Sequence, residues 1–176
     1  MGHDPAPPKG RRVMDAGAIE GALDRIARAI VERNPDLGAV MLLGIQKGGV
    51  PLAQRIASHI ERISGVAVRC GTLDVSFHRD DLGSRLPVPE ATELPGSLSG
   101  STVVLVDSVL YSGRTVRAAF EALHHYGRPE RIQLAVLVDR GHRELPISPD
   151  FVGAEIPTVK GQRVRVREDY VMVVEP

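Results

Sequence analysis

The sequence predicts an α/β fold in which helices flank a central, mainly parallel sheet, with a small hairpin at the carboxyl end. Residues 39–43 form a short, uniformly apolar run, and residues 102–106 and 132–138 form two mostly apolar runs, which are typical of strands that are buried in a central sheet. Segments with helical periodicity alternate with these runs. Strands that alternate with helices at this spacing imply right-handed crossovers and a parallel sheet covered on both faces.

The first half of the chain predicts two helices and two strands. Asp15 can cap a first helix, in which apolar residues recur at helical spacing until Asn34-Pro35 stops it. The strand over residues 39–43 ends in Gly44. A helix over residues 50–63 and a strand over residues 66–75 follow.

The second half begins with a long polar segment, residues 77–101, which is rich in Pro, Gly and Ser and has neither a helical nor a strand period. A loop of that length inside a compact domain is typical of a functional segment. The remaining predicted elements are the strand 102–106, a polar turn, a helix over 115–126, the strand 132–138, a charged turn over 139–144, and a hairpin formed by 164–166 and 171–174.

Composition limits the class of protein. The 176 residues are 43% apolar and 25% charged, with zero formal net charge, which is typical of one soluble globular domain. We expect residues 1–12 to form a flexible tail and residues 13–176 a single domain. Cys70 is the only cysteine, which favours a reducing compartment, and no run resembles a secretory signal or a membrane span. The predicted location is the cytoplasm, without membrane contact.

The turn after the strand 102–106 carries the strongest chemical signal. Ser112, Gly113 and Thr115 stand where the next helix begins, so backbone N–H groups and hydroxyls can surround a phosphate at the positive end of the helix dipole. Asp107 can accept hydrogen bonds from sugar hydroxyls. A structural alternative is that Asp107 and Ser112 only cap turns. The pattern is neither a Walker motif nor a dinucleotide fingerprint.

The residues themselves resemble a known family. Residues 103–119, Val-Val-Leu-Val-Asp-Ser-Val-Leu-Tyr-Ser-Gly-Arg-Thr-Val-Arg-Ala-Ala, are similar to the phosphoribosyl diphosphate (PRPP) motif of type I phosphoribosyltransferases. More closely, the chain resembles the PyrR family of pyrimidine operon attenuators, which also have uracil phosphoribosyltransferase activity. The resemblance extends over residues 79–82, 127–129, 134–147, 150–153 and 156–158 and the first helix. It implies a type I phosphoribosyltransferase fold with a C-terminal hood.

The resemblance also implies roles for single residues. Asp107 contacts the ribose and, with Arg79 on the long loop, forms the catalytic set, while Arg79 closes over the diphosphate. Lys47 and Gly48 handle pyrophosphate, and Arg140 and Val164 lie beside the nucleobase. The residues that bind substrate through the motif itself are Asp107, Ser108, Val109, Leu110, Tyr111, Ser112, Gly113, Arg114 and Thr115.

Three positions depart from the family pattern. Ser108 stands where the family has a second acid, Gly48 where it usually has Arg, and Val159 where it has Ser. A hydroxyl lacks the charge that offsets a cationic transition state, and the nearby Lys47 is a point charge that does not reproduce the fork of an arginine. These departures weaken the expected transferase turnover.

Two functions are implied, and they can coexist. One is a glycosyltransferase reaction in which uracil and PRPP give UMP and pyrophosphate, with Mg²⁺ bound to PRPP. The other is a UMP-sensing regulator that binds the leader of pyrimidine biosynthetic mRNA through Arg25, Arg28, His142 and Arg143. The alternatives are a regulator with impaired catalysis and a phosphoribosyltransferase for another base, such as a purine. The family also implies a homodimer or a larger homo-oligomer.

Overall fold

The protein folds into two sheets, described here from a computed structural model that covers residues 9–80, 83–84 and 86–176. Five parallel strands form the main sheet in the order β3-β2-β4-β5-β6, and three antiparallel strands form a second sheet in the order β1-β8-β7. The main strands are β2 (Val40–Ile45), β3 (Arg69–Leu73), β4 (Thr102–Leu110), β5 (Arg131–Asp139) and β6 (Phe151–Glu155). This is the expected α/β class.

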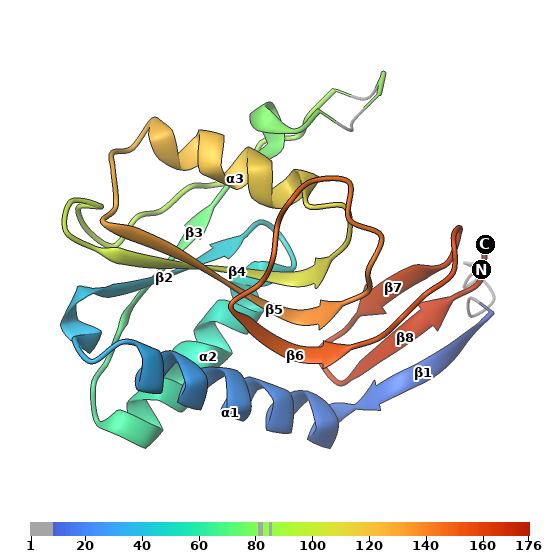
Figure 1. Ribbon diagram of the computed structural model, residues 1–176, viewed down its shortest axis with the longest axis horizontal. Helices are drawn as coiled ribbons and strands as arrows, with labels where there is room; N and C mark the ends of the chain where they lie inside the picture. Colours follow the sequence, from blue (N-terminus) through green and yellow to red (C-terminus); the bar gives the residue numbers. More distant parts are fainter. Residues whose placement is uncertain (1–8, 81–82, 85) are drawn as a thin grey trace, which may run out of the picture.

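Helices cover both faces of the main sheet (Figure 1). The helices α1 (Ala16–Arg33) and α2 (Gly49–Ser64) pack on one face, where Ile26 and Ile56 belong to the same apolar core as Val104. Helix α3 (Arg114–His124) packs on the other face with Leu105. Asp15 caps α1 as predicted, because its carboxylate accepts a hydrogen bond of 2.8 Å from the N–H of Ala18. None of the helices in the described ranges is long and apolar enough to cross a bilayer.

Strand β4 is longer than the sequence predicts. It runs to Leu110, so Asp107 and the three residues after it belong to the strand rather than to the turn that we expected. Their pairing with β5 continues to the partners Leu110 and Asp139, which explains the extension. Consecutive residues of a strand point to opposite faces, so Asp107 and Ser108 face different sides of the sheet.

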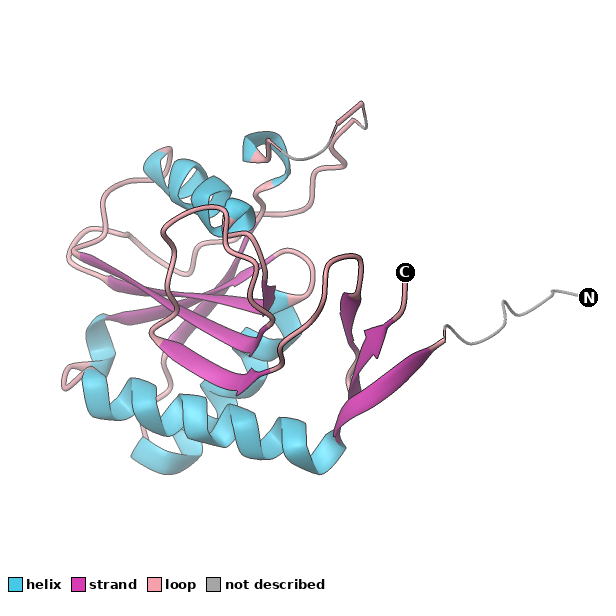
Figure 2. Cartoon of the chain, turned by 45° about the vertical axis from the view of Figure 1, so that its right-hand side comes forward, coloured by secondary structure: helices cyan, strands magenta, loops and turns pink. Residues whose placement is uncertain are grey.

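The second sheet corrects the prediction of a free tail over residues 1–12. Residues 10–12 belong to β1 (Gly10–Asp15), which pairs with β8 (Tyr170–Val174), whereas residues 1–8 lie outside the described residues. The predicted hairpin is present as β7 (Arg163–Val166) and β8. We call these three strands the hood, because they lie beyond the carboxyl ends of β4 and β5 (Figures 1 and 2).

Two other segments differ from simple expectation. Strand β6 was not predicted, since its five residues are followed closely by Pro157 and show no clear strand signal. The polar segment from 77 to 101 contains the end of a short 3-10 helix, η2 (Ser76–His78), and takes part in two isolated antiparallel bridges, Thr72 with Glu93 and Ser99 with Pro129. Of residues 79–82, which carry part of the family resemblance, the structure describes Arg79 and Asp80.

Candidate functional site

The loop between β4 and α3, residues 111–113, is fixed by its packing. Gly113 adopts φ 94°, which favours glycine, and a Cβ atom there would lie 2.9 Å from a side-chain carbon of Ile147. The carbonyl of Ser112 accepts hydrogen bonds from the N–H groups of Glu144 and Leu145, at 2.9 and 3.1 Å. The crossover between β5 and β6 therefore holds this loop in place.

The start of α3 can accept an anion. Its N-cap residue is Gly113, which offers no side chain, so the first-turn N–H groups receive no side-chain capping bond from it. A cavity of about 200 Å³ opens here, and we call it the cradle cavity. It is lined by Arg79, Asp107, Val109, Leu110, Tyr111, Ser112, Gly113, Arg114, Thr115, Val116 and Arg140.

Asp107 has an unusual carboxyl group at the edge of this cavity. Burial raises its pKa to about 6, although the N–H of Ser108, which donates at 2.7 Å, and the charge of Arg79 both act to lower it. A carboxylate that is largely ionised at neutral pH but poorly solvated interacts strongly with a positive charge that develops nearby. Asp107 is therefore suited to stabilising a cationic sugar.

The segment that carries Arg79 is tied to the start of α3. Asp80 receives a hydrogen bond of 3.0 Å from a terminal nitrogen of Arg114, and Arg114 also donates through its Nε to Glu144 at 2.9 Å. The hydrogen bond to Glu144 and the charge of Asp80 raise the pKa of Arg114. The side chain of Arg114 thus holds the surrounding segments, and Arg114 is also among the residues that line the cradle cavity.

Arg140 is buried, and two nitrogens of its guanidinium donate hydrogen bonds. It donates to the hydroxyl of Thr158 at 3.1 Å and to the carbonyl of Gln162 at 2.7 Å, and it lies 4.1 Å from the ring centroid of Tyr111. Arg140 lines both the cradle cavity and a neighbouring cavity of about 440 Å³ next to Glu155. A planar base that entered this second cavity would lie beside Arg140.

The loop after β2 lies on the other side of β4. Lys47 forms an ion pair with Glu90 at 2.9 Å, and that hydrogen bond raises the pKa of Lys47. Gly48 is the N-cap of α2 and lies against Ser108, so that a Cβ atom on Gly48 would be 2.7 Å from the Ser108 hydroxyl. Two of the positions that depart from the family pattern are therefore in contact with each other.

Comparison with known proteins identifies the family. The phosphoribosyl transferase domain family matches residues 12–170. A relative named bifunctional protein PyrR, from Roseiflexus sp. (strain RS-1), is 54% identical over 159 residues, which are 89% of this chain and 87% of the relative. The chain belongs to the PyrR family. A second PyrR, from Pelotomaculum thermopropionicum, is 49% identical over 172 residues, 93% of this chain and 95% of the relative.

Solved structures extend the likeness of this PyrR-family chain to the fold. The hypoxanthine phosphoribosyl transferase of Trypanosoma cruzi superposes with a TM-score of 0.74 at 20% sequence identity, covering 98% of this chain and 95% of that chain. The protein therefore has the type I phosphoribosyltransferase fold, as the sequence predicted. At this identity the likeness carries no information on which base is used.

The remaining residues of interest in this PyrR-family chain lie outside the cradle cavity. Val164 is on β7 and lines a cavity beside α2 rather than the one next to Arg140. Val159 is 65% exposed in the loop before the hood. The role of Val164 beside a base stays a prediction. A base beside Val164 would lie in the cavity next to α2, and a base beside Arg140 would lie in the cavity next to Glu155.

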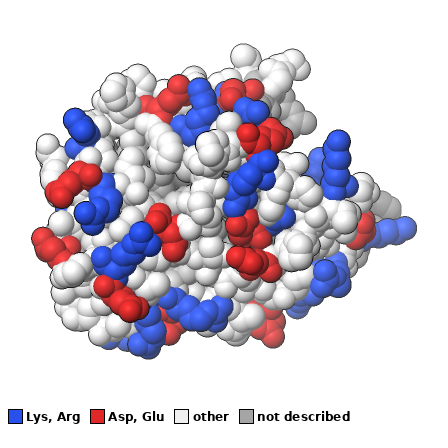
Figure 3. Space-filling model, viewed as in Figure 1, with Lys and Arg blue, Asp and Glu red and all other residues white. Residues whose placement is uncertain are grey.

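The residues predicted to bind RNA fall into two pairs. Arg25 and Arg28 are exposed on α1, where Arg25 donates to the carbonyl of Gly153 and Arg28 pairs with Asp24 at 2.8 Å. The second pair, His142 and Arg143, follows β5. Figure 3 shows that basic and acidic side chains are interspersed over one face of the molecule.

His142 and Arg143 have different environments. His142 is exposed and its ring Nε2 lies 2.7 Å from the carbonyl of Thr158. Arg143 is half-buried and donates to the carbonyls of Tyr111 and Ile147, both at 2.9 Å, and to the carboxylate of Asp139. These three bonds give Arg143 a structural role in shaping the loop beside Tyr111, whatever else it contacts.

Sequence reasoning missed several residues that shape the site. Thr158 and Gln162 orient Arg140, and Glu144 anchors both the Ser112 carbonyl and the Arg114 side chain. Such contacts join residues that are 18 to 32 positions apart, so no local pattern reveals them. Glu144 and Thr158 had a signal, since they belong to the segments 134–147 and 156–158 that resemble the family.

Proposed function

We propose that this PyrR-family chain is a UMP-sensing regulator of pyrimidine biosynthetic mRNA that also transfers the phosphoribosyl group of PRPP to uracil. The observation that carries the proposal is the cradle cavity, in which Asp107 faces the start of α3 beside Arg79 and Arg140. A cavity lined by a carboxylate, a helix start and the three arginines Arg79, Arg114 and Arg140 suits a ligand that combines a sugar with phosphates. The family membership supports the choice of a pyrimidine.

In the proposed reaction N1 of uracil attacks C1 of the ribose. The bond from C1 to the diphosphate oxygen breaks, the diphosphate leaves with the bonding electrons, and the N1 proton is lost to water. Positive charge develops on the sugar and negative charge on the leaving group. The Asp107 carboxylate offsets the first charge, and Arg79 offsets the second, while the start of α3 holds the 5′-phosphate.

The proposed chemistry includes a magnesium ion that arrives with PRPP. Within the described part of the chain no cluster of three or more His, Cys, Asp or Glu residues is suited to a metal ion. Magnesium in such sites commonly uses one or two carboxylates together with substrate phosphates, so the Asp107 carboxylate fits an ion carried by the substrate. When bound, the ion neutralises charge on the leaving diphosphate.

Regulation is proposed to use a different surface. Arg25 and Arg28 are exposed on α1, and His142 is exposed after β5, so each side chain is accessible to RNA phosphates. Because the formal net charge of the chain is zero, binding has to come from local groups of this kind. We further propose that the protein acts in the cytoplasm as a homodimer or a larger homo-oligomer.

One assay tests the transferase directly. Purified protein is mixed with PRPP, Mg²⁺ and either uracil or hypoxanthine, and diphosphate release is followed. We expect release that depends on uracil. Release with hypoxanthine alone supports the purine alternative, and no release with either base, together with a rise in melting temperature on adding UMP, supports a regulator without turnover.

A further inference from the structure

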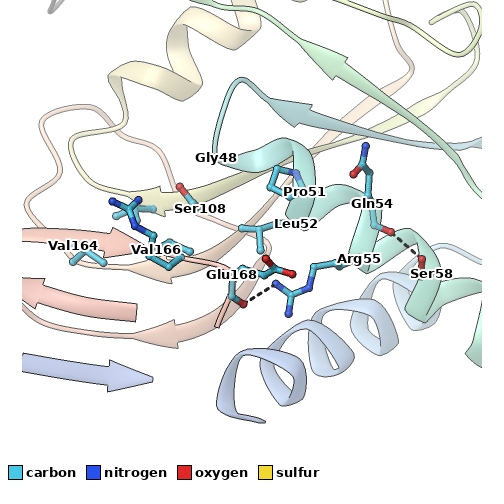
Figure 4. A pocket seen from close by; sticks show the side chains of 12 residues that line it. Gly48, Pro51, Leu52, Gln54, Arg55, Ser58, Ser108, Val164, Val166 and Glu168 are labelled. Carbon is cyan, nitrogen blue, oxygen red and sulfur yellow. Dashed lines mark hydrogen bonds between the residues drawn. The ribbon is translucent and has the colours of Figure 1, made fainter. Parts of the chain in front are cut away.

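Another cavity, of about 650 Å³, lies on the α2 side of β4, next to the cradle cavity (Figure 4). The first turns of α2 and the end of β4 form one side of it. Strand β7 of the hood and the turn after β7 form the other side, and we therefore call it the hood cavity. Gly48 and Ser108 line it from one side, and Val164 and Val166 line it from the hood. Val109 lines both cavities, so the two meet at the end of β4.

The two cavities receive different residues of the PRPP motif. Asp107 lines the cradle cavity and Ser108 lines the hood cavity, as expected for neighbours on a strand. A ligand whose ribose lies at Asp107 can therefore extend past Val109 toward Ser108. The group that extends from C1 of the ribose in PRPP is the diphosphate.

The loop before α2 brings no cation into the hood cavity. Gly48 has no side chain, and a residue with a Cβ atom there would lie 2.7 Å from the Ser108 hydroxyl. Lys47 is paired with Glu90 and is not among the residues that line this cavity. Arg79, which acts on the leaving group in the proposed reaction, lines the cradle cavity, so positive charge within the hood cavity has to come from another element.

Two arginines line the hood cavity, and they differ in how far they are engaged. Arg55 donates its Nε to the Glu20 carboxylate at 3.1 Å and a terminal nitrogen to the Glu168 carbonyl at 3.4 Å. Arg167, in the turn after β7, is exposed, and across residues 9–80, 83–84 and 86–176 its guanidinium makes no hydrogen bond or ion pair. Its backbone N–H donates to Tyr170 at 2.8 Å, which fixes the turn.

We propose that Arg167 binds the diphosphate group of PRPP in the hood cavity and supplies there the positive charge that Gly48 does not carry. The inference rests on the proposed function, because it takes PRPP as the ligand. A guanidinium binds a phosphate through two parallel hydrogen bonds, which a lysine cannot reproduce. The hood then contributes to leaving-group binding as well as covering the site.

Glu168 provides a second test of the inference, because its loss should change diphosphate affinity in the opposite direction. This residue also lines the hood cavity, and a carboxylate there repels a diphosphate. Its contact with Arg55 uses the backbone carbonyl, so Glu168→Gln keeps that hydrogen bond while removing the charge. Loss of Arg167 should weaken diphosphate binding, and loss of the Glu168 charge should strengthen it.

The test is calorimetric titration of the full chain with inorganic diphosphate and with PRPP, each with Mg²⁺, and separately with UMP. The variants are wild type, Arg167→Ala, Glu168→Gln and the matched control Arg165→Ala. Arg165 lies on β7 between Val164 and Val166, which both line the cavity, so its side chain points to the opposite face.

For Arg167→Ala we expect affinity for diphosphate and PRPP to fall about tenfold, the usual order for one charge-assisted hydrogen-bonding group. UMP affinity should not change, because UMP has no diphosphate. Glu168→Gln should tighten diphosphate binding about threefold, in line with a partly screened charge. Arg165→Ala should match wild type, and equal melting temperatures establish that all variants are folded.

Two results overturn the inference. One is unchanged diphosphate affinity in Arg167→Ala, and the other is equal weakening by Arg167→Ala and Arg165→Ala, which would indicate only general charge attraction. If wild type binds UMP and PRPP in these experiments, the proposed function stands and only the role of Arg167 is lost. If wild type binds neither, the proposed function fails and the inference fails with it.

Discussion

The loops that precede α2 and α3 have the same plan and differ in what holds them. Each follows a central parallel strand, and each ends in a glycine N-cap, Gly48 or Gly113, that makes no side-chain capping hydrogen bond. Gly113 has φ 94°, and the crossover before β6 anchors the residue before it. Gly48 has an ordinary helical φ of −64° and is constrained by its contact with Ser108.

Gly113 and Gly48 are therefore required for different structural reasons. Gly113 is required by backbone conformation, so any side chain strains the loop itself. Gly48 is required by space, so the cost of a side chain depends on whether Ser108 can move. The loop before α3 therefore depends on the backbone and tolerates little change, whereas the loop before α2 depends on its partner residue and can change together with it.

The largest effect is expected for Asp107→Asn, which removes the poorly solvated carboxylate near the end of β4. Turnover should fall by about 10² to 10³, the usual loss for one electrostatic group that acts on a transition state. The free energy of unfolding at pH 8 should rise by about 1 to 3 kcal/mol, because a poorly solvated charge is removed. Steady-state kinetics and urea unfolding measure the two effects.

The same substitution has a pH signature. With its pKa raised to about 6, Asp107 holds more protons in the folded state than in the unfolded state between roughly pH 4 and 6. The wild-type free energy of unfolding should therefore fall as pH rises through that window, relative to Asp107→Asn. Wild-type kcat/KM should fall as pH drops below about 6. Parallel unfolding profiles for the two proteins would contradict the buried charge.

A matched pair of alanines probes the two loops directly. Gly113→Ala should destabilise the fold by about 2 kcal/mol, through its positive φ and the contact with Ile147, and should weaken both UMP and PRPP binding. Gly48→Ala should change stability by less than about 1 kcal/mol, because the Ser108 hydroxyl can rotate, and should weaken PRPP binding alone. Thermal unfolding and calorimetry distinguish the two. Equal losses of UMP affinity would show that the loops are not specialised.

Ser108→Asp tests whether the second acid limits catalysis. The carboxylate would enter the space that Gly48 leaves open and add roughly 1 to 3 kcal/mol of transition-state stabilisation, a rate increase of about tenfold or more. The measurement is turnover with uracil, PRPP and Mg²⁺. Ser108→Asn, which has the same shape as the Asp variant without the charge, should not increase the rate. Unchanged or lower turnover in Ser108→Asp means that this departure does not limit the reaction.

The smallest effect is expected away from both loops, at Arg25 and Arg28. Removing one arginine that binds an RNA phosphate should flatten the dependence of log affinity on log salt by about one unit. The double variant Arg25→Ala and Arg28→Ala is titrated with labelled leader RNA at two salt concentrations in the presence of UMP. UMP affinity should stay at the wild-type value, because these side chains lie on α1 outside the cradle cavity.

The alternative is that these arginines only stabilise the surface. Arg28 already pairs with Asp24, which also pairs with Arg62 at 2.7 Å, and exposed pairs of this kind contribute little. Equal RNA affinities and equal salt slopes for wild type and the double variant remove α1 from the RNA surface. His142→Ala is then the next variant, since the Arg143 side chain is engaged by the loop around it.

The sequence by itself determined the elements that local patterns encode. Mostly apolar runs predicted the central strands, the Asp15 cap predicted the start of α1, and the polar turn after residues 102–106 predicted the start of α3. These predictions succeed because hydrophobic periodicity, capping and turn chemistry act over a few neighbouring residues. The predicted tail failed at residues 10–12, because a strand at the sheet edge depends on its partner β8.

Only the tertiary structure decided how the site is divided. The alternation of side chains along an extended β4 sends Asp107 into one cavity and Ser108 into the other, and the sequence had assigned both to a turn. Gly48 and Ser108, which are in contact, are 60 positions apart in the chain, and Arg167 on the other side of the hood cavity is 59 positions from Ser108. Contacts over such separations are set by how helices and sheets pack, and that packing depends on the whole core rather than on any local segment.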